Sequence, residues 1–127
     1  RIIRHALHAR ARGRPAAHPI VFISRKSADP NSTGTARKDV PDPDNLHEAC
    51  DSFGGRCRVV NPETLSFSGQ FRIFSQARVI LGAHGAALAW AWSMRSGGMI
   101  VELDIPRGSI GRCSCYAKMA RWFAHTF

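Results

Sequence analysis

The stretch from Val79 to Leu88 constrains the fold more than any other part of the sequence. An apolar run ends in Gly82-Ala83-His84-Gly85, and small residues then begin a helical pattern. This order predicts a strand, a tight turn and a helix N-terminus, because glycine lets backbone and ligand approach without a side chain between them. A helix N-terminus has unpaired N–H groups and the positive end of the dipole, which suits a phosphate. The same residues also fit an ordinary turn in which His84 caps the helix.

Strand and helix patterns alternate along the chain after Pro19. Short apolar runs predict buried strands near residues 20–24, 56–60, 78–82 and 99–103. Apolar spacings of three and four residues predict four helices. The first is capped by Asp44, ends at Gly54-Gly55 and has Leu46, Ala49, Cys50 and Phe53 on one face. The second is capped by Ser66 and contains Phe67, Phe71 and Phe74; the third runs from about Gly85 to Met94; the fourth contains Tyr116, Met119, Ala120 and Phe123. The alternation predicts a Rossmann-like α/β fold, a mostly parallel sheet with helices on both faces.

Ligands of such sheets bind at the carboxyl ends of the strands. Those ends carry Ser24-Arg25, Gly82–Gly85 and Glu102–Asp104. We therefore predict that Arg25, His84, Gly85 and Glu102 converge on one cleft. Trp90, Trp92 and Phe123 are expected in the core rather than as platforms for a sugar.

The candidate side chains each have a second interpretation. Arg25 suits a diphosphate through its paired donors, but a solvated arginine fits the same place. His84 suits a phosphate or a base, and we expect it to contact a ligand rather than act as a general base. Glu102 ends an apolar strand, where a carboxylate needs hydrogen bonds. A ribose diol supplies them, and so does pairing with Arg95 or Arg107.

Length and charge limit the classes of protein. The chain has 127 residues, 18 of them basic and nine acidic, for a net charge of +9. Without residues 1–18 the balance falls to 13 basic against nine acidic residues, a net +4. We expect residues 1–18 to be a basic leader, a linker or a disordered segment, and residues 19–127 to be one domain. This distribution disfavours a nucleic-acid-binding protein, whose basic residues would form a stripe with exposed aromatics.

No apolar run approaches the roughly 18 residues of a membrane span. The chain starts at Arg1 and stops at Phe127 directly after a helical pattern, so we expect it to be a fragment of a longer protein.

The four cysteines leave two interpretations open. Cys50 and Cys57 close a short loop, and Cys113 and Cys115 are two residues apart; no spacing matches a zinc site, so we predict no metal. Buried thiols or a Cys50–Cys57 disulfide both fit, and a disulfide implies an oxidising compartment. Asn31-Ser32-Thr33 is an N-glycosylation sequon, which fits a lumenal chain.

Several segments together resemble one family. They are Ile23-Ser24-Arg25, Arg37, Pro62-Glu63-Thr64-Leu65-Ser66-Phe67, Phe74-Ser75-Gln76-Ala77, Gly82-Ala83-His84-Gly85-Ala86-Ala87-Leu88 and Val101-Glu102-Leu103. In order and spacing they resemble the carboxyl-terminal part of glycosyltransferase family 61, over about residues 20–127. Where the family often continues His-Gly-Ala with Gly-Leu-Thr-Asn, this chain has Ala87-Leu88-Ala89-Trp90.

The resemblance implies the donor-binding half of a GT-B type enzyme. Such an enzyme transfers a sugar of the xylose or N-acetylglucosamine type, with inversion, from a nucleotide sugar (a UDP-sugar) to a glycan or glycoprotein acceptor. No cofactor would be bound permanently, and no nucleic acid would be a partner. The donor and its diphosphate would bind at Arg25, Arg37, His84, Gly85, Ala86 and Glu102. The implied location is the lumen of the Golgi or endoplasmic reticulum, with any membrane anchor outside this chain. The alternative is a non-catalytic α/β module, or an inactive partial copy of the family, that acts in interaction alone.

Overall fold

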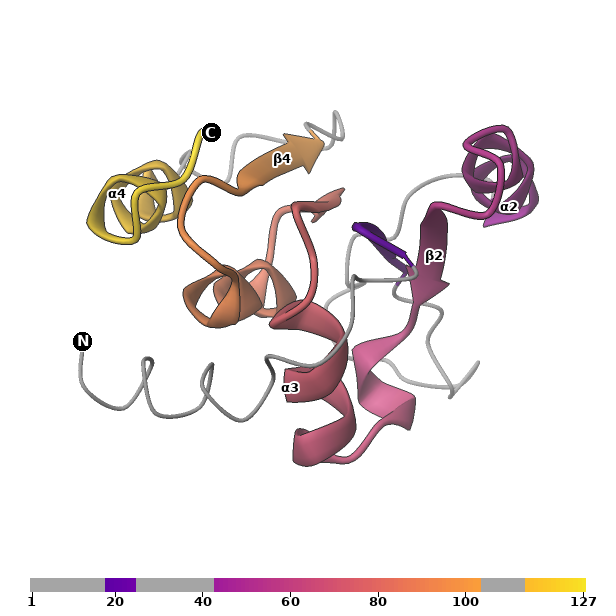
Figure 1. Ribbon diagram of the computed structural model, residues 1–127, viewed down its shortest axis with the longest axis horizontal. Coiled ribbons are helices and arrows are strands. Elements are labelled where there is room, and N and C mark those ends of the chain that lie inside the picture. The colour runs from indigo at the N-terminus through magenta and orange to yellow at the C-terminus, as the bar shows by residue number, and fades with distance from the viewer. Residues whose placement is uncertain (1–17, 25–42, 104–113) are drawn as a thin grey trace, which may run out of the picture.

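A parallel sheet forms the centre of the computed structural model, which describes residues 18–24, 43–103 and 114–127 (Figure 1). Its strands are β1 (Ile20–Ile23), β2 (Cys57–Val60), β3 (Val79–Ala83) and β4 (Met99–Leu103). They lie in the order β2-β1-β3-β4, and every neighbouring pair is parallel. The predicted parallel α/β sheet is confirmed, with each strand end within one residue of its expected place.

Helices cover both faces of this sheet. Helix α2 (Pro43–Asp51) leads from β1 to β2, whereas α3 (Phe67–Phe74) and the 3₁₀ helix η2 (Ala86–Ser93) lead to β3 and β4 on the other side of β1. Because such crossovers are right-handed, the two directions put α2 on one face and α3 and η2 on the other. Figure 1 shows α2 and α3 on opposite sides of the strands. Helix α4 (Cys115–Trp122) packs against η2 and β4.

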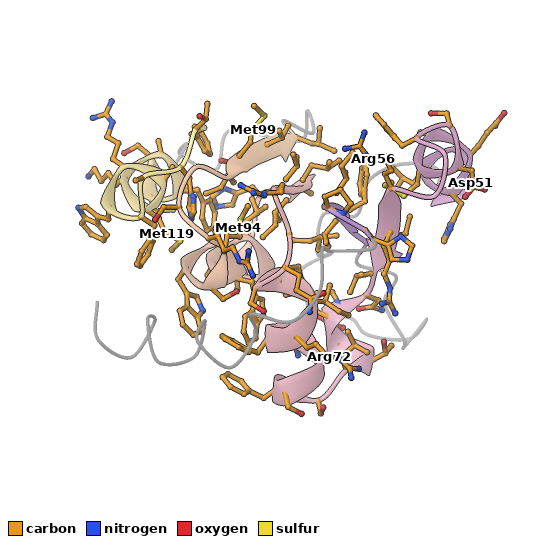
Figure 2. The ribbon with its side chains drawn as sticks, in the orientation of Figure 1. Asp51, Arg56, Arg72, Met94, Met99 and Met119 are labelled. Carbon is orange, nitrogen blue, oxygen red and sulfur yellow. A yellow bond between two sulfur atoms is a disulfide. The ribbon has the colours of Figure 1, made fainter. Side chains whose placement is uncertain are left out.

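The core lies between the sheet and the face that carries α3, η2 and α4. Val21, Ile80 and Ile100 pair across β1, β3 and β4, and all three are fully buried there with Phe74 of α3. Their apolar side chains point to one face because side chains alternate along a strand. Figure 2 shows Met94, directly after η2, inside this layer. The core thus fixes the sheet against α3, η2 and α4.

The helix predicted from Gly85 to Met94 is present, but it is a 3₁₀ helix. Leu88 N–H donates to Gly85 O at 2.9 Å and Met94 N–H to Ala91 O at 3.1 Å, both across three residues. Side chains three apart eclipse each other in this helix type. Leu88, Ala91 and Met94, at that spacing, are all completely buried. The buried stripe therefore follows a period of three.

Helix α2 differs from the prediction at both ends. It begins at Pro43, so Asp44 lies inside the helix and is not its cap. It ends at Asp51, so Phe53 leaves the predicted apolar face and is half exposed, as Gly54 and Gly55 take positive φ angles of 61° and 78°. The glycines follow the helix as expected, but the helix ends two residues earlier than the spacing of Phe53 required.

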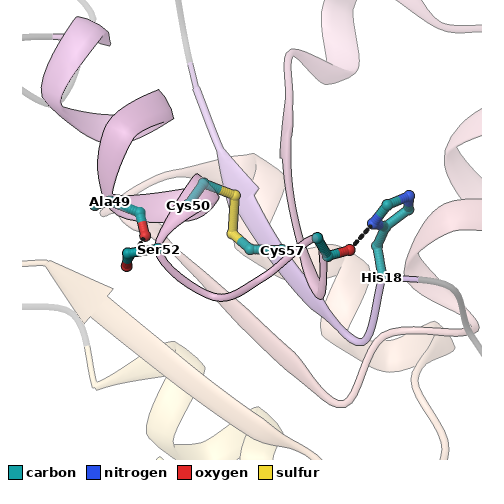
Figure 3. The surroundings of a disulfide bond; sticks show 6 residues. His18, Ala49, Cys50, Ser52 and Cys57 are labelled. Carbon is teal, nitrogen blue, oxygen red and sulfur yellow. Dashed lines mark hydrogen bonds between the residues drawn. A yellow bond between two sulfur atoms is a disulfide. The ribbon is translucent and has the colours of Figure 1, made fainter.

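A disulfide ties α2 to the start of β2. Cys50 and Cys57, both on the side of the sheet that α2 covers, are joined with their Cα atoms 5.1 Å apart (Figure 3). Next to it, Gly55 O accepts a hydrogen bond from His18 Nδ1 at 2.7 Å. Of the two interpretations of Cys50 and Cys57, the structure has the disulfide rather than buried thiols.

The residues after α4 return to the sheet beside β4. Ile100 N–H donates to Thr126 O at 2.8 Å, and Thr126 N–H donates to Gly98 O at 2.9 Å. None of the described helices combines the length and apolar character that crossing a membrane requires. The predicted leader lies outside the described residues except for His18.

Candidate functional site

The strand order places a topological switch point at the carboxyl edge of the sheet, between β1 and β3. From β1 the chain first moves to β2 and then crosses to β3, so the direction of winding reverses between β1 and β3. In open α/β sheets this is where ligands bind. Gly82 keeps the two strands close, because a Cβ atom there would lie 3.0 Å from Ile23 Cβ. His84 follows β3 directly, beside this point.

Two of the predicted site residues, His84 and Glu102, contact each other at this edge. In the ladder between β3 and β4, Glu102 lies opposite Gly82, two residues before His84. His84 Nδ1 and Glu102 Oε1 are hydrogen-bonded, and the contact becomes an ion pair when the imidazole is protonated. The His84 side chain is 44% exposed and that of Glu102 is 19% exposed. The carboxylate is therefore mostly covered, while the imidazole reaches solvent.

The pair also identifies one partner of Glu102 among the described residues. The sequence suggested a ribose or an arginine, Arg95 or Arg107, as the group that would satisfy this carboxylate. The structure gives it His84, and Arg107 lies outside the described residues. The hydrogen bond from His84 offsets the free-energy cost of desolvating a carboxylate at the end of an apolar strand.

Tyr116 also contacts the histidine. It is a buried residue of α4, and its ring meets that of His84 edge-on with the ring centroids 5.3 Å apart. The spacing of Tyr116 in the sequence indicates a helix face and nothing more. Its contact with a residue 32 positions away depends on how α4 packs against η2, which no local pattern reveals.

The first turn of η2 begins next to His84. Gly85 is its N-cap, with φ at 153°, and no side chain caps the helix there. Ala86 is exposed. The first N–H groups of a helix lack acceptors within the helix, so this turn offers backbone donors without a competing side chain. Gly85 and Ala86, which the sequence predicted to bind an anion, are thus the N-cap and the first residue of η2.

The remaining predicted site residues fall outside the described part of the chain. They are Arg25, Arg37 and the sequon residue Asn31. Arg25 follows Ser24, a buried residue whose N–H donates to Val60 O at 2.9 Å at the end of β1. Of the residues predicted to share a cleft, His84 and Glu102 contact each other, and Gly85 follows His84 in the chain.

The tryptophans of η2 pack against α3. Trp90 stacks on Phe74 with the centroids 5.6 Å apart, and Trp92 contacts Phe71 at 6.0 Å. Both tryptophans are half-buried, in keeping with the expected core role, although Phe67 at the outer end of the cluster is 70% exposed. In residues 18–24, 43–103 and 114–127, no three His, Cys, Asp or Glu side chains group as metal ligands would.

The His84–Glu102 pair has a defined chemistry. An ionised carboxylate only accepts hydrogen bonds, so the hydrogen between the two residues is carried by Nδ1 of the imidazole. Nε2 is then the ring nitrogen left for another molecule. In neutral histidine it accepts a hydrogen bond, and in protonated histidine it donates one. The edge therefore combines an oriented imidazole with the backbone donors of η2.

The comparison with protein families agrees with this arrangement. The family model described as Glycosyltransferase 61 matches residues 1–101, about four fifths of the chain. The match includes β1 to β3, the His84-Gly85 turn, η2 and the first half of β4. The search of curated proteins found no relative. With its parallel sheet and the polar pair at the carboxyl edge, the chain belongs to glycosyltransferase family 61.

Proposed function

We propose that this chain is the donor-binding part of a glycosyltransferase that moves a sugar from a nucleotide sugar to a hydroxyl group of a glycan or protein. The meeting of His84 and Glu102 beside the first turn of η2, in a chain of this family, carries the proposal. The backbone N–H groups at Gly85 and Ala86 receive the diphosphate, assisted by Arg25 and Arg37. The reaction places the acceptor hydroxyl in line with the leaving diphosphate and inverts the anomeric centre.

The donor in this proposal is a UDP-sugar of the xylose or N-acetylglucosamine type. The diphosphate is its most demanding part, because two phosphates need several donors and positive charge in one place. A helix N-terminus at the winding reversal of a parallel sheet supplies the donors. The domain is one half of a GT-B enzyme, and the acceptor site is formed with the other half.

Binding of uridine diphosphate and of uridine tests the donor site. Both ligands are titrated calorimetrically into the full chain and into the variant Arg25→Ala. A charged contact to phosphate contributes about 1.5–3 kcal/mol to binding. Arg25→Ala should therefore lower the affinity for uridine diphosphate about ten- to a hundredfold and leave the affinity for uridine almost unchanged. Arg72→Ala is the matched control, since Arg72 is an exposed arginine of α3 (Figure 2).

The outcomes separate the two classes of function. Equal losses for both ligands, or no loss, would remove Arg25 from the diphosphate site. No binding of uridine diphosphate by the unmodified chain would contradict the donor site altogether and favour a non-catalytic module.

We further propose that the chain works in the lumen of the Golgi or endoplasmic reticulum. Disulfides persist in oxidising compartments, and Cys50, Cys57 and Cys115 are all disulfide-bonded. Alkylation of the protein during cell lysis tests this. Cys50 and Cys57 should react only after reduction, and labelling before reduction would contradict a lumenal location.

A further inference from the structure

The hydrogen bond to Glu102 fixes the orientation of the His84 imidazole. Glu102 lies on the face of β4 that η2 and α4 cover, and it holds Nδ1 from that side. The Tyr116 ring meets the imidazole edge-on from α4. With Nδ1 occupied and 44% of the side chain exposed, the accessible polar atom of His84 is Nε2.

A neutral imidazole held this way accepts a proton at Nε2. A carboxylate on Nδ1 fixes the tautomer that has its lone pair on Nε2, and it stabilises the imidazolium that forms when Nε2 takes a proton. A histidine that merely donated to a phosphate would need no fixed tautomer, since both nitrogens carry hydrogen when it is charged. The pair therefore suits a ligand group that gives up a proton to Nε2.

We propose that His84 is the general base of the transfer and that Glu102 is its positioning residue. This proposal rests on the proposed function, because it needs the donor bound at Gly85 and Ala86. It departs from the expectation drawn from the sequence, in which His84 contacts the donor and does not act as a base. The added observation is the carboxylate on Nδ1.

Nε2 takes the proton of the acceptor hydroxyl while the oxygen forms a bond to the anomeric carbon of the sugar. The bond between that carbon and the diphosphate oxygen breaks, and its electron pair leaves with the nucleoside diphosphate. The proton on Nε2 passes to solvent after the product leaves.

The tautomer of His84 provides a test that needs no ligand. Nitrogen NMR of the full chain, labelled with ¹⁵N histidine and run above the titration of the ring, should show hydrogen on Nδ1. Glu102→Ala should move it mainly to Nε2, whereas Glu102→Gln retains an oxygen that accepts from Nδ1. Hydrogen already on Nε2 in the unmodified chain would overturn the pairing.

Transfer kinetics of the complete enzyme, this domain together with the acceptor half, test the role of the pair. A positioned base contributes about 10²- to 10⁴-fold to the rate, so His84→Gln should lower kcat by that factor. The affinity for uridine diphosphate should change less than about threefold. Glu102→Gln should retain more activity than Glu102→Ala. Glu48→Gln, at an exposed carboxylate of α2, is the matched control and should leave kcat unchanged.

The pH dependence of the reaction adds a second readout. Activity should fall at low pH as one group becomes protonated, and His84→Gln should remove this fall because the base itself is gone. Among the described residues, the titratable groups that contact the ring are Glu102 on β4 and Tyr116 on α4.

Each outcome decides between the two proposals. If His84→Gln weakens the binding of uridine diphosphate by the same factor as it lowers kcat, His84 binds the sugar donor. The base proposal is then wrong, while the proposed donor site stands. If kcat is retained, the base is another residue. If the unmodified chain binds no uridine diphosphate, the proposed function fails and the base proposal fails with it.

Discussion

The Cys50–Cys57 disulfide should contribute a large share of the stability of this chain. It links residues seven positions apart, closing a loop that includes the end of α2 and the two glycines with positive φ. For a loop of about eight residues, the loss of chain entropy in the unfolded state corresponds to about 2.5 kcal/mol at 25 °C. A chain of 127 residues has an unfolding entropy of about 0.27 kcal/mol/K, so loss of the cross-link lowers Tm by about 9 °C.

The double variant Cys50→Ala/Cys57→Ala tests this by thermal unfolding followed by circular dichroism. Alanine is chosen because serine would put a hydroxyl at the buried Cys50 position. Ser52→Ala in the same loop is the control: it loses one exposed hydrogen bond, to Ala49 O at 2.6 Å, worth about 1 kcal/mol or about 4 °C. A Tm of the double variant within about 2 °C of the unmodified chain would refute the entropic argument.

Three further substitutions test the packing, a helix cap and the turn at the site. Phe74→Ala empties a fully buried position that stacks on Trp90 and should cost about 3–5 kcal/mol in urea unfolding; a loss below about 1 kcal/mol would contradict its place in the core. Ser66→Ala removes the acceptor of the Gly69 N–H bond at 3.2 Å and should cost about 1 kcal/mol in the same assay, while an unchanged midpoint would show that the cap adds nothing. Gly85→Ala places a side chain at φ 153° and should lower the free energy of unfolding by about 1–3 kcal/mol. It should also lower the affinity for uridine diphosphate measured by calorimetry. Unchanged stability together with unchanged affinity would count against a constrained turn.

The fold was largely predictable because its strands are short apolar runs that both faces of the sheet bury. Val21, Phe22 and Ile23 of β1 are all buried, as in a central parallel strand, and this gives a run without alternation that is easy to recognise. The order of the strands was less accessible. It depends on which way each crossover turns, and the sequence gives the alternation of elements rather than their order in the sheet.

The helix ends were predictable only where a local hydrogen bond sets them. Ser66 caps α3 as expected because its side chain accepts from Gly69 N–H three residues on. The cap expected at Asp44 failed because Pro43 already fits the first turn of a helix with its fixed φ. A favourable cap residue therefore predicts a start only when the residue before it does not itself continue into the helix.

The candidate site was predictable as a set of strand ends but not as a pair. Parallel topology brings the carboxyl ends of β3 and β4 together, so the nearness of His84 and Glu102 follows from the alternation of strands and helices. Their direct bond depends on a finer feature, the register that puts Glu102 opposite Gly82. A register shift of one residue would turn the carboxylate to the other face of the sheet, away from α4 and Tyr116.

The 3₁₀ form of η2 has a consequence for the packing of the tryptophans beside the site. Successive residues turn about 100° in an α-helix and about 120° in a 3₁₀ helix. Trp90 and Trp92 therefore lie about 120° apart around η2 rather than about 160°. The smaller angle lets both reach α3 and stack on each other, with their centroids 6.0 Å apart. The signal in the sequence was the spacing of three between the apolar residues Leu88, Ala91 and Met94, which are all completely buried. In an α-helix, residues at this spacing would not lie in one row along the helix. Contact with α3 thus fixes η2, which begins directly after Gly85, and with it the direction of the first N–H groups beside His84.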